Sequence, residues 1–198
     1  MKNLIKRWLT VMAAVAVFTS ASLAAPVTDT LKHQQNTEID MIILRGNVRV
    51  YLIQKIQGSM KIVTSRTAEE LTVTKRGEKL LINSEQNEPV VLYIYLKNLK
   101  RIEASNTAVV RTSGNFNLKL LQVILHDGAR AELNIHTEAL YTQLKDQSKL
   151  HLAGSTEEHV LVRGKVSNLK MEKFSALKTD TIPYQLLLAD EKLAGQVH

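Results

Sequence analysis

The chain has 198 residues, a formal charge of +7 at neutral pH and no cysteine. The absence of cysteine excludes disulfides, cysteine-ligated zinc and a lipid-modified N-terminal cysteine. Three of the cations lie within the first seven residues, so the remainder carries about +4, an ordinary solubility charge that does not indicate a nucleic-acid partner.

The first 24 residues have the three parts of a secretory signal peptide, in the order that export requires. Basic residues come first, an apolar run follows and small residues end the segment: Lys2, Lys6, Arg7, 9–18 and 19–25. The pattern predicts cleavage after Ala24 in preference to Ala25, and export to the periplasm, the cell surface or the medium. An apolar run of about ten residues is half the length of a spanning helix, which disfavours an uncleaved anchor. We therefore expect a mature form that does not span a membrane and that has lost Trp8, the only tryptophan.

Strand-like patterning begins after a polar stretch, 25–38, that is predicted to be a flexible lead. From residue 39 onward apolar and polar residues alternate with period two, the pattern of strands with one buried face. Clear examples are 48–52 and 71–74, and 90–96 is a near-continuous β-prone run. Gly77 can supply the positive φ of a tight turn.

The second half of the chain repeats a unit of about 20 residues. Each copy is an alternating strand, a small polar turn and a second alternating strand, and the copies begin at Leu99, Leu121, Leu140 and Val160. This period predicts an all-β fold, a single-stranded right-handed parallel β-solenoid (β-helix) over 39–180 with some antiparallel N-terminal strands. An antiparallel sandwich is the alternative, because it also has short strands at regular spacing. Residues 181–198, apolar at 186–188, are predicted to be a cap or tail at the last coil.

Four stretches carry a resemblance to a known family: 43–52, 80–82, 91–96 and 99–105. Together they resemble the head GIN domain, a family described as a putative auto-transporter adhesin (domain of unknown function 2807). The resemblance covers roughly residues 40–180 and implies an exported protein with N-terminal strands followed by β-helix coils. Where that family favours Ser-Gly at its turns, this chain has Asn or Asp, which tolerate left-handed backbone better than other non-glycine residues.

Three of these turn residues fall at the same place in successive copies: Asn106, Asp127 and Asp146. If the coils stack, the three residues form a ladder along one corner. Asp127 and Asp146 are weak candidates for a Ca²⁺ site, but Ca²⁺ takes about six to eight oxygen ligands. We favour turn residues that hydrogen-bond to their own backbone, and we expect no metal ion and no cofactor.

Catalytic patterns are missing from the sequence. A zinc site needs about three or four convergent ligands, and His136 and His151 fall at different points of their coils, so convergence is not implied. The four histidines of the second half are therefore expected on the surface: His126, His136, His151 and His159. The acids are scattered, and no G-x-S-x-G, H-E-x-x-H or P-loop motif occurs, so no catalytic residue is predicted.

The sequence thus predicts an exported, non-catalytic β-solenoid module that acts in adhesion or in binding at the cell envelope. Its expected partner is a cell-envelope glycan or protein, and its oligomeric state is not specified. The alternative is a carbohydrate-active enzyme on the same scaffold, which requires a pocket lined by a pair of carboxylates. Five cations suggest a basic stripe for anionic glycans, although a solvated face is favoured: Lys97, Lys100, Arg101, Arg111 and Lys119.

Overall fold

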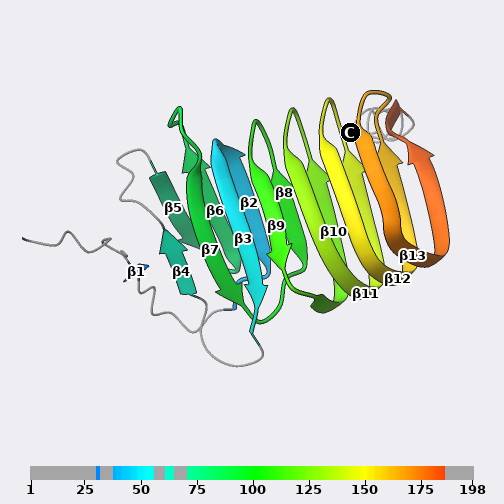
Figure 1. The fold of residues 1–198 in the computed structure, drawn as a ribbon, viewed down its shortest axis with the longest axis horizontal. Helices are drawn as coiled ribbons and strands as arrows, with labels where there is room; N and C mark the ends of the chain where they lie inside the picture. The colour runs from blue at the N-terminus through cyan, green and yellow to red at the C-terminus, as the bar shows by residue number, and fades with distance from the viewer. Residues whose placement is uncertain (1–29, 32–37, 56–60, 65–70, 186–198) are drawn as a thin grey trace, which may run out of the picture.

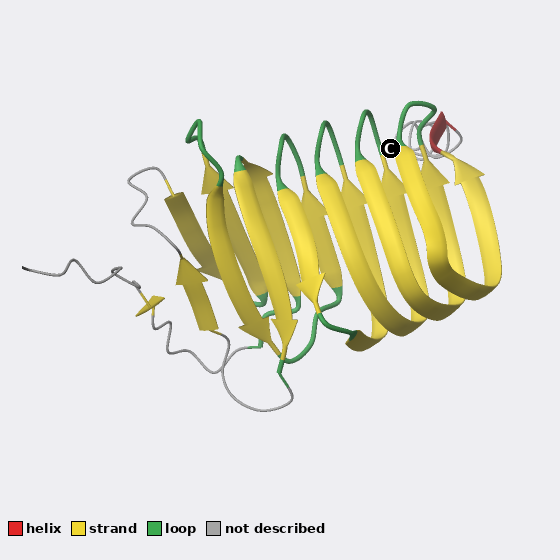
Figure 2. Cartoon of the chain, viewed as in Figure 1, coloured by secondary structure: helices red, strands yellow, loops and turns green. Residues whose placement is uncertain are grey.

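The computed structural model describes residues 30–31, 38–55, 61–64 and 71–185. The predicted signal peptide, most of the predicted lead and the apolar part of the predicted cap lie outside these residues. Within them the chain forms strands almost throughout, and only Tyr184 and Gln185 have helical geometry (Figure 2). The described residues contain no helix that is long and apolar enough to cross a membrane.

The described residues form thirteen strands. In chain order they are β1 (Thr30–Leu31), β2 (Met41–Gly46), β3 (Val48–Gln54), β4 (Lys61–Thr64), β5 (Leu71–Arg76), β6 (Lys79–Ser84), β7 (Val90–Leu96), β8 (Arg101–Ala104), β9 (Val109–Ser113), β10 (Phe116–Leu125), β11 (Arg130–Leu144), β12 (Lys149–Arg163) and β13 (Asn168–Pro183).

All of these strands belong to one curled, mixed sheet (Figure 1). Nine pairings are parallel, and the three antiparallel ones, β1–β4, β4–β7 and β5–β6, all involve strands of the N-terminal half. The prediction of an all-β fold is confirmed, and so is the presence of antiparallel N-terminal strands. The sheet as a whole is curled and mixed, and not a uniform parallel solenoid. An antiparallel sandwich, the alternative fold, would lack the nine parallel pairings that this sheet contains.

The sheet folds back on itself, so that its two halves enclose the core. Strands β2, β6 and β8 pair on one side, and β3, β7 and β9 pair on the other. Strands β10–β13 continue both sides by bending, and tight turns join the sides at the opposite edge (Figure 1). Apolar side chains fill the interior, among them Leu44, Val50, Leu92 and Ile135, each with 0% of its surface exposed.

The parallel ladders repeat at a nearly constant offset along the chain. Val123 lies opposite Thr142, and Thr142 lies opposite Leu161, so each step advances 19 residues. Extended strands that return at this interval bury the same face at every step, because side chains alternate between the two faces. The predicted copies at 121 and 140 are in register, whereas the one at 160 is wrong by one residue, since Leu140 lies opposite His159.

Candidate binding surfaces

The turns that join the two sides of the sheet carry a ladder of polar side chains. Asn106, Asp127 and Asp146 have left-handed backbones with φ of 59°, 54° and 53°. The backbone N–H of Asn106 donates to Asp127 Oδ2 at 2.9 Å, and the N–H of Asp127 donates to Asp146 Oδ2 at 3.2 Å. The N–H of Gly46 donates to Asn106 Oδ1 at 3.2 Å, which adds a further rung. Each side chain therefore accepts from the backbone of a neighbouring turn, whereas the sequence predicted hydrogen bonds to its own backbone.

This ladder stabilises the turns, because it satisfies backbone N–H groups that the strands leave unpaired. One carboxylate oxygen of Asp127 and one of Asp146 is already used as an acceptor. No group of three or more His, Asp or Glu side chains within the described residues is placed to hold a metal ion. The expectation of no metal ion at these turns, with Asp127 and Asp146 as weak candidates for Ca²⁺, stays a prediction.

A groove runs across the bends of β10–β13. These bends lie at the lower edge of the sheet in Figure 1. Its volume is about 760 Å³, and it is lined by Asn98, Asn117, Leu118, Lys119, His136, Thr137, Glu138, Ser155, Thr156, Glu157, Ser175 and Leu177. The floor is formed by Leu118, Thr137 and Thr156, all of them buried. The hydroxyls of Thr137 and Thr156 each donate to two backbone carbonyls of the bends, at 2.9–3.3 Å. The hydroxyl protons of the floor are therefore used within the protein, and the polar groups that remain are those of the walls.

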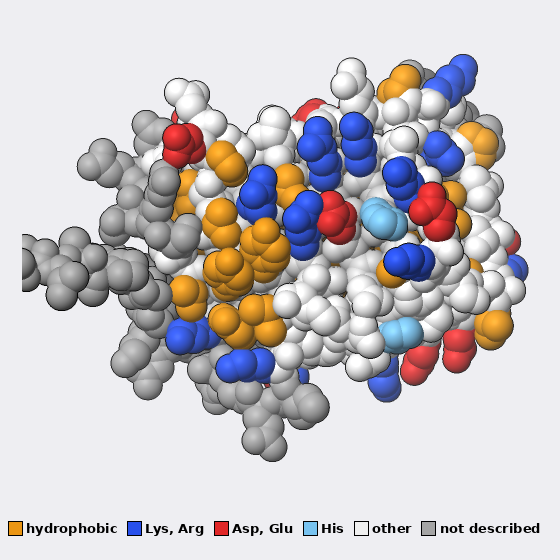
Figure 3. Space-filling view, viewed as in Figure 1, with side chains coloured by type: hydrophobic (Ala, Val, Ile, Leu, Met, Phe, Trp, Pro, Cys, Tyr) orange, Lys and Arg blue, Asp and Glu red, His pale blue; other side chains and the backbone are white. Residues whose placement is uncertain are grey.

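Two rows of polar side chains form these walls. One row is Asn117, His136, Ser155 and Ser175, which lie opposite one another in register. The other row contains Lys119, Glu138 and Glu157, one residue from each of β10, β11 and β12. Acidic, basic and histidine side chains gather at the lower right in Figure 3. Since neighbouring strands lie about 4.8 Å apart, the rows offer hydrogen-bonding groups at a regular spacing.

The groove has parts of catalytic sites but lacks their supporting geometry. His136 Nδ1 lies 2.9 Å from Ser155 Oγ, as in a nucleophile and its base. Acyl transfer also needs N–H donors aimed at an oxyanion, and the parallel ladders occupy the backbone around both residues. Glu138 and Glu157 supply a pair of carboxylates, and both are exposed.

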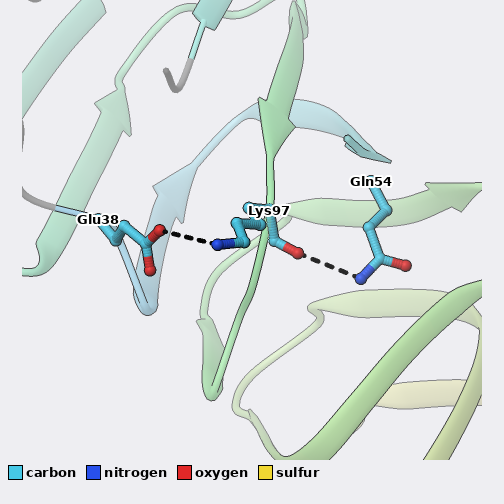
Figure 4. Close-up of polar contacts among 3 residues, drawn as sticks. All are labelled: Glu38, Gln54 and Lys97. Carbon is cyan, nitrogen blue, oxygen red and sulfur yellow. Dashed lines mark hydrogen bonds and ion pairs between the residues drawn. The ribbon is translucent and has the colours of Figure 1, made fainter. Parts of the chain in front are cut away.

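Gln54, at the end of β3, fixes one end of the groove. Its Nε2 donates to the carbonyls of Asn117 and Lys97, at 2.9 and 3.2 Å, and its Oε1 accepts the N–H of Asn117 at 2.8 Å. The side-chain amide of Gln54 thus makes the pair of hydrogen bonds to Asn117 that a peptide group of a neighbouring strand would make at the start of β10. Lys97 is held in turn, because its Nζ lies 3.6 Å from Glu38 Oε1 (Figure 4).

A second surface, the tyrosine patch, lies on the outer side of β3 and β7. It consists of Tyr51, Ile53, Val91, Tyr93 and Tyr95, and Figure 3 shows hydrophobic side chains clustered there. The rings of Tyr51 and Tyr93 stack with centroids 5.2 Å apart and an interplanar angle of 16°. Sequence reasoning missed this patch, although 90–96 is apolar at successive positions and therefore places apolar side chains on both faces of a strand.

The expectation that the four histidines lie on the surface is wrong for His159, which is 1% exposed. The register of β12 turns this residue inward, opposite the buried Leu140. Its Nε2 lies 2.8 Å from Thr142 Oγ1, and its ring packs edge-on against Phe174 at 5.9 Å. Burial lowers the pKa of His159. Among the others, burial and the nearby Lys145 lower the pKa of the half-buried His126.

The five cations of the suggested basic stripe are mostly neutralised by acidic partners. The ion pairs are Lys97–Glu38 at 3.6 Å, Lys100–Asp40 at 2.8 Å, Arg101–Glu103 at 2.9 Å and Arg111–Glu132 at 2.8 Å. The fifth, Lys119, lines the groove. A continuous positive stripe is therefore replaced by alternating charges.

Comparisons with known proteins identify one family and several similar folds. The family model DUF2807, described as "Putative auto-transporter adhesin, head GIN domain", matches residues 38–181. A putative adhesin from Bacteroides fragilis has 13% identity and a TM-score of 0.61, covering 74% of this chain and 72% of its own. A putative adhesin from Parabacteroides distasonis has 9% identity and a TM-score of 0.56, covering 74% of each chain. A putative lipid binding protein from Parabacteroides distasonis has 10% identity and a TM-score of 0.54, covering 75% of this chain and 76% of its own. None of the curated proteins compared with the chain matches it.

Proposed function

Because the chain belongs to the DUF2807 family, the head GIN domain of putative auto-transporter adhesins, we propose that it is an exported, non-catalytic module that binds an extended glycan of the cell envelope. The groove across β10–β13 is the observation that carries this proposal. The description of the family as adhesins supports both a binding role and a place outside the cytoplasm. The signal-like pattern of residues 1–24 supports export as well.

The proposal includes a right-handed parallel β-solenoid arrangement for the coils of the second half. The 19-residue offset of the parallel ladders supports it, as does the strong preference of parallel crossovers for right-handed connections. Such a coil repeats the same side-chain position at every strand. A binding site built on it is therefore a row and not a single point.

The chemistry of the rows favours a glycan as the ligand. Amide, hydroxyl, imidazole and carboxylate groups together donate and accept hydrogen bonds, which suits a chain of hydroxyl groups. Lys119 and Glu157 put opposite charges at the groove wall, which disfavours a uniformly charged polymer such as nucleic acid. A polymer of repeating units matches the repetition of the rows from strand to strand.

The alternative of a carbohydrate-active enzyme meets the requirement for two carboxylates in one pocket, through Glu138 and Glu157. Their exposure supports binding over hydrolysis, because water competes for both groups. The two functions differ in product. A glycan that binds should be recovered at its original length after long incubation, whereas shortened chains would establish the enzyme.

The test uses an array of peptidoglycan strands, O-antigen polysaccharide and capsular polysaccharide, followed by calorimetric titration of the glycans that bind. Glu157→Gln removes a charge-assisted hydrogen bond from the groove and should weaken binding about tenfold. Glu158→Gln is the matched control, because Glu158 is the adjacent exposed acid of β12 and does not line the groove. The proposal would be overturned if no glycan of the array binds, or if Glu157→Gln and Glu158→Gln lower glycan affinity equally.

A further inference from the structure

The tyrosine patch lies on an outer face of the sheet. A sheet face in contact with solvent alone usually carries polar side chains. The inward residues of the same strands, such as Val50 and Leu92, are 0% exposed, so the core already has its apolar side. Tyr93, on the outward side, is 39% exposed. Figure 3 shows the cluster at the left of the view, on the surface of the molecule. Tyr93 is therefore exposed on this face, and the other four patch residues are half-buried beside it.

The arrangement of the rings argues against a sugar as the occupant of this patch. Tyr51 and Tyr93 stack on one another, which covers one face of each ring. On the other sides, Arg111 lies opposite Tyr51 in register, and Val63 lies opposite Tyr93. A sugar would meet ring edges here, whereas it stacks on open ring faces. Ring edges suit the boundary between headgroups and acyl chains, where tyrosine is enriched.

The charges around the patch argue for a negatively charged occupant. Arg49 lies beside it on β3, and Lys61 lies beside it on β4. Lys55 Nζ lies 4.8 Å from the centroid of the Tyr95 ring. Strands β3, β4 and β7 contain no aspartate or glutamate. A second copy of the chain would bring these cations against their equivalents, which disfavours a dimer through this face.

We propose that the tyrosine patch docks the protein on the surface of a lipid bilayer with anionic headgroups. The three patch tyrosines and Ile53 enter the interface between headgroups and acyl chains, and Arg49, Lys55 and Lys61 pair with phosphate groups around them. Apolar contact and charge attraction reinforce each other, as in other peripheral membrane proteins. This site differs from the groove in its residues, its strands and its ligand.

The test is co-sedimentation of the purified protein with vesicles, either of phosphatidylcholine alone or of equal parts phosphatidylglycerol and phosphatidylcholine. We expect binding to the anionic vesicles and a steep loss of binding as salt is added. Tyr93→Ser should lower the partition coefficient at least tenfold. Lys61→Gln, at an exposed position where folding is not at risk, should lower it about fivefold.

Val166→Ser is the control, because Val166 is 69% exposed but lies in a turn away from the patch. It should leave vesicle binding unchanged. Failure to sediment with anionic vesicles, equal binding to both vesicle types, or an equal loss in the control variant would overturn the proposal. Self-association in the ultracentrifuge that Tyr93→Ser abolishes, without vesicle binding, would assign the patch to a second copy instead.

Discussion

Asp127 is the middle residue of the turn ladder, and three substitutions at this position separate its two contributions to stability. Its backbone is left-handed, with φ of 54°, and its Oδ2 accepts the N–H of Asn106 at 2.9 Å. Asp127→Asn keeps a residue that tolerates this backbone and keeps an acceptor. Asp127→Gly keeps only the backbone tolerance, and Asp127→Ala loses both.

The magnitudes follow from the two interactions that the side chain makes. Loss of the hydrogen bond costs about 1 kcal/mol, less than is usual for a charged acceptor, because the turn is exposed. A left-handed backbone costs an alanine about 1 kcal/mol more than it costs glycine. The free energy of unfolding should therefore fall by less than about 0.5 kcal/mol in Asp127→Asn, by about 1 kcal/mol in Asp127→Gly and by about 2 kcal/mol in Asp127→Ala.

The assay is urea unfolding at neutral pH, followed by circular dichroism. Gln147→Ala is the control, because Gln147 is an exposed turn residue next to Asp146 and has an ordinary backbone conformation. Its effect should stay within about 0.5 kcal/mol, as for most surface substitutions. If Asp127→Ala were as stable as Asp127→Gly, the left-handed turn would have no energetic role. If both matched Asp127→Asn, the ladder hydrogen bond would have none.

Three further predictions address the core, the groove and the close approach of two strands. Because burial lowers the pKa of His159, the unfolded chain binds the proton more tightly, so this group should lower the free energy of unfolding as the pH drops below about 6.5, by at most about 1.4 kcal/mol per pH unit. Unfolding between pH 5 and 8 should show a shallower slope in His159→Leu, with a remainder from His126, whose pKa burial also lowers, and an unchanged slope in the control with the exposed His151→Leu. Gln54→Ala should speed amide hydrogen exchange at the start of β10, because it removes three hydrogen bonds to the loop and strand beside it, and unchanged exchange would contradict its role as a substitute peptide. A Cβ on Gly154, where φ is 101°, would collide with a backbone carbonyl of β11, so Gly154→Ala should lower the free energy of unfolding by about 3 kcal/mol or more. In the control Gly114→Ala, φ is 82° and the space around the glycine is open, so the free energy of unfolding should fall by only about 1 kcal/mol. Equal losses in the two variants would refute the collision.

Local patterns in the sequence predict much of this fold. Period-two alternation gives strands such as β3 and β6, and Gly77 sits at a tight turn with φ of 58°, as its neighbours suggest. The repeat length predicts the parallel ladders of β10–β13, because identical turns return the chain to the same place. These signals are local in the sequence, because the alternation of side chains and the backbone preferences of turn residues determine where strands and turns form.

The remaining features depend on which residues meet across the sheet. Lys97 and Glu38 are far apart in the sequence, so no pattern shows that this pair neutralises part of the basic stripe. His159 reads as a polar surface residue until the register of β12 turns it inward to Thr142. Leu140 lies opposite His159 and not opposite Val160, the predicted start of the fourth copy, and a shift of one residue exchanges the two faces of a strand.

The groove could have been found from the sequence. Asn117, His136 and Ser155 lie within β10, β11 and β12 at intervals of 19 residues, and they pair in register. The same alignment that predicts a ladder of turn residues therefore also predicts a row of polar groups at the bends. What the alignment does not give is the depth of the groove, which depends on the curvature of the strands.

The two proposed surfaces lie on different strands, and they should act independently. The patch belongs to β3 and β7, whereas the groove belongs to the bends of β10–β13, so no side chain is shared. Substitutions at separate, non-contacting sites have additive effects. Tyr93→Ser should therefore leave glycan affinity within about twofold of the unmodified protein, and Glu157→Gln should do the same for vesicle binding. Titration of each variant with both ligands tests this, and a loss of glycan affinity in Tyr93→Ser as large as in Glu157→Gln would merge the two surfaces into one site. Independence would instead mean that a membrane-docked molecule keeps its groove free for a glycan.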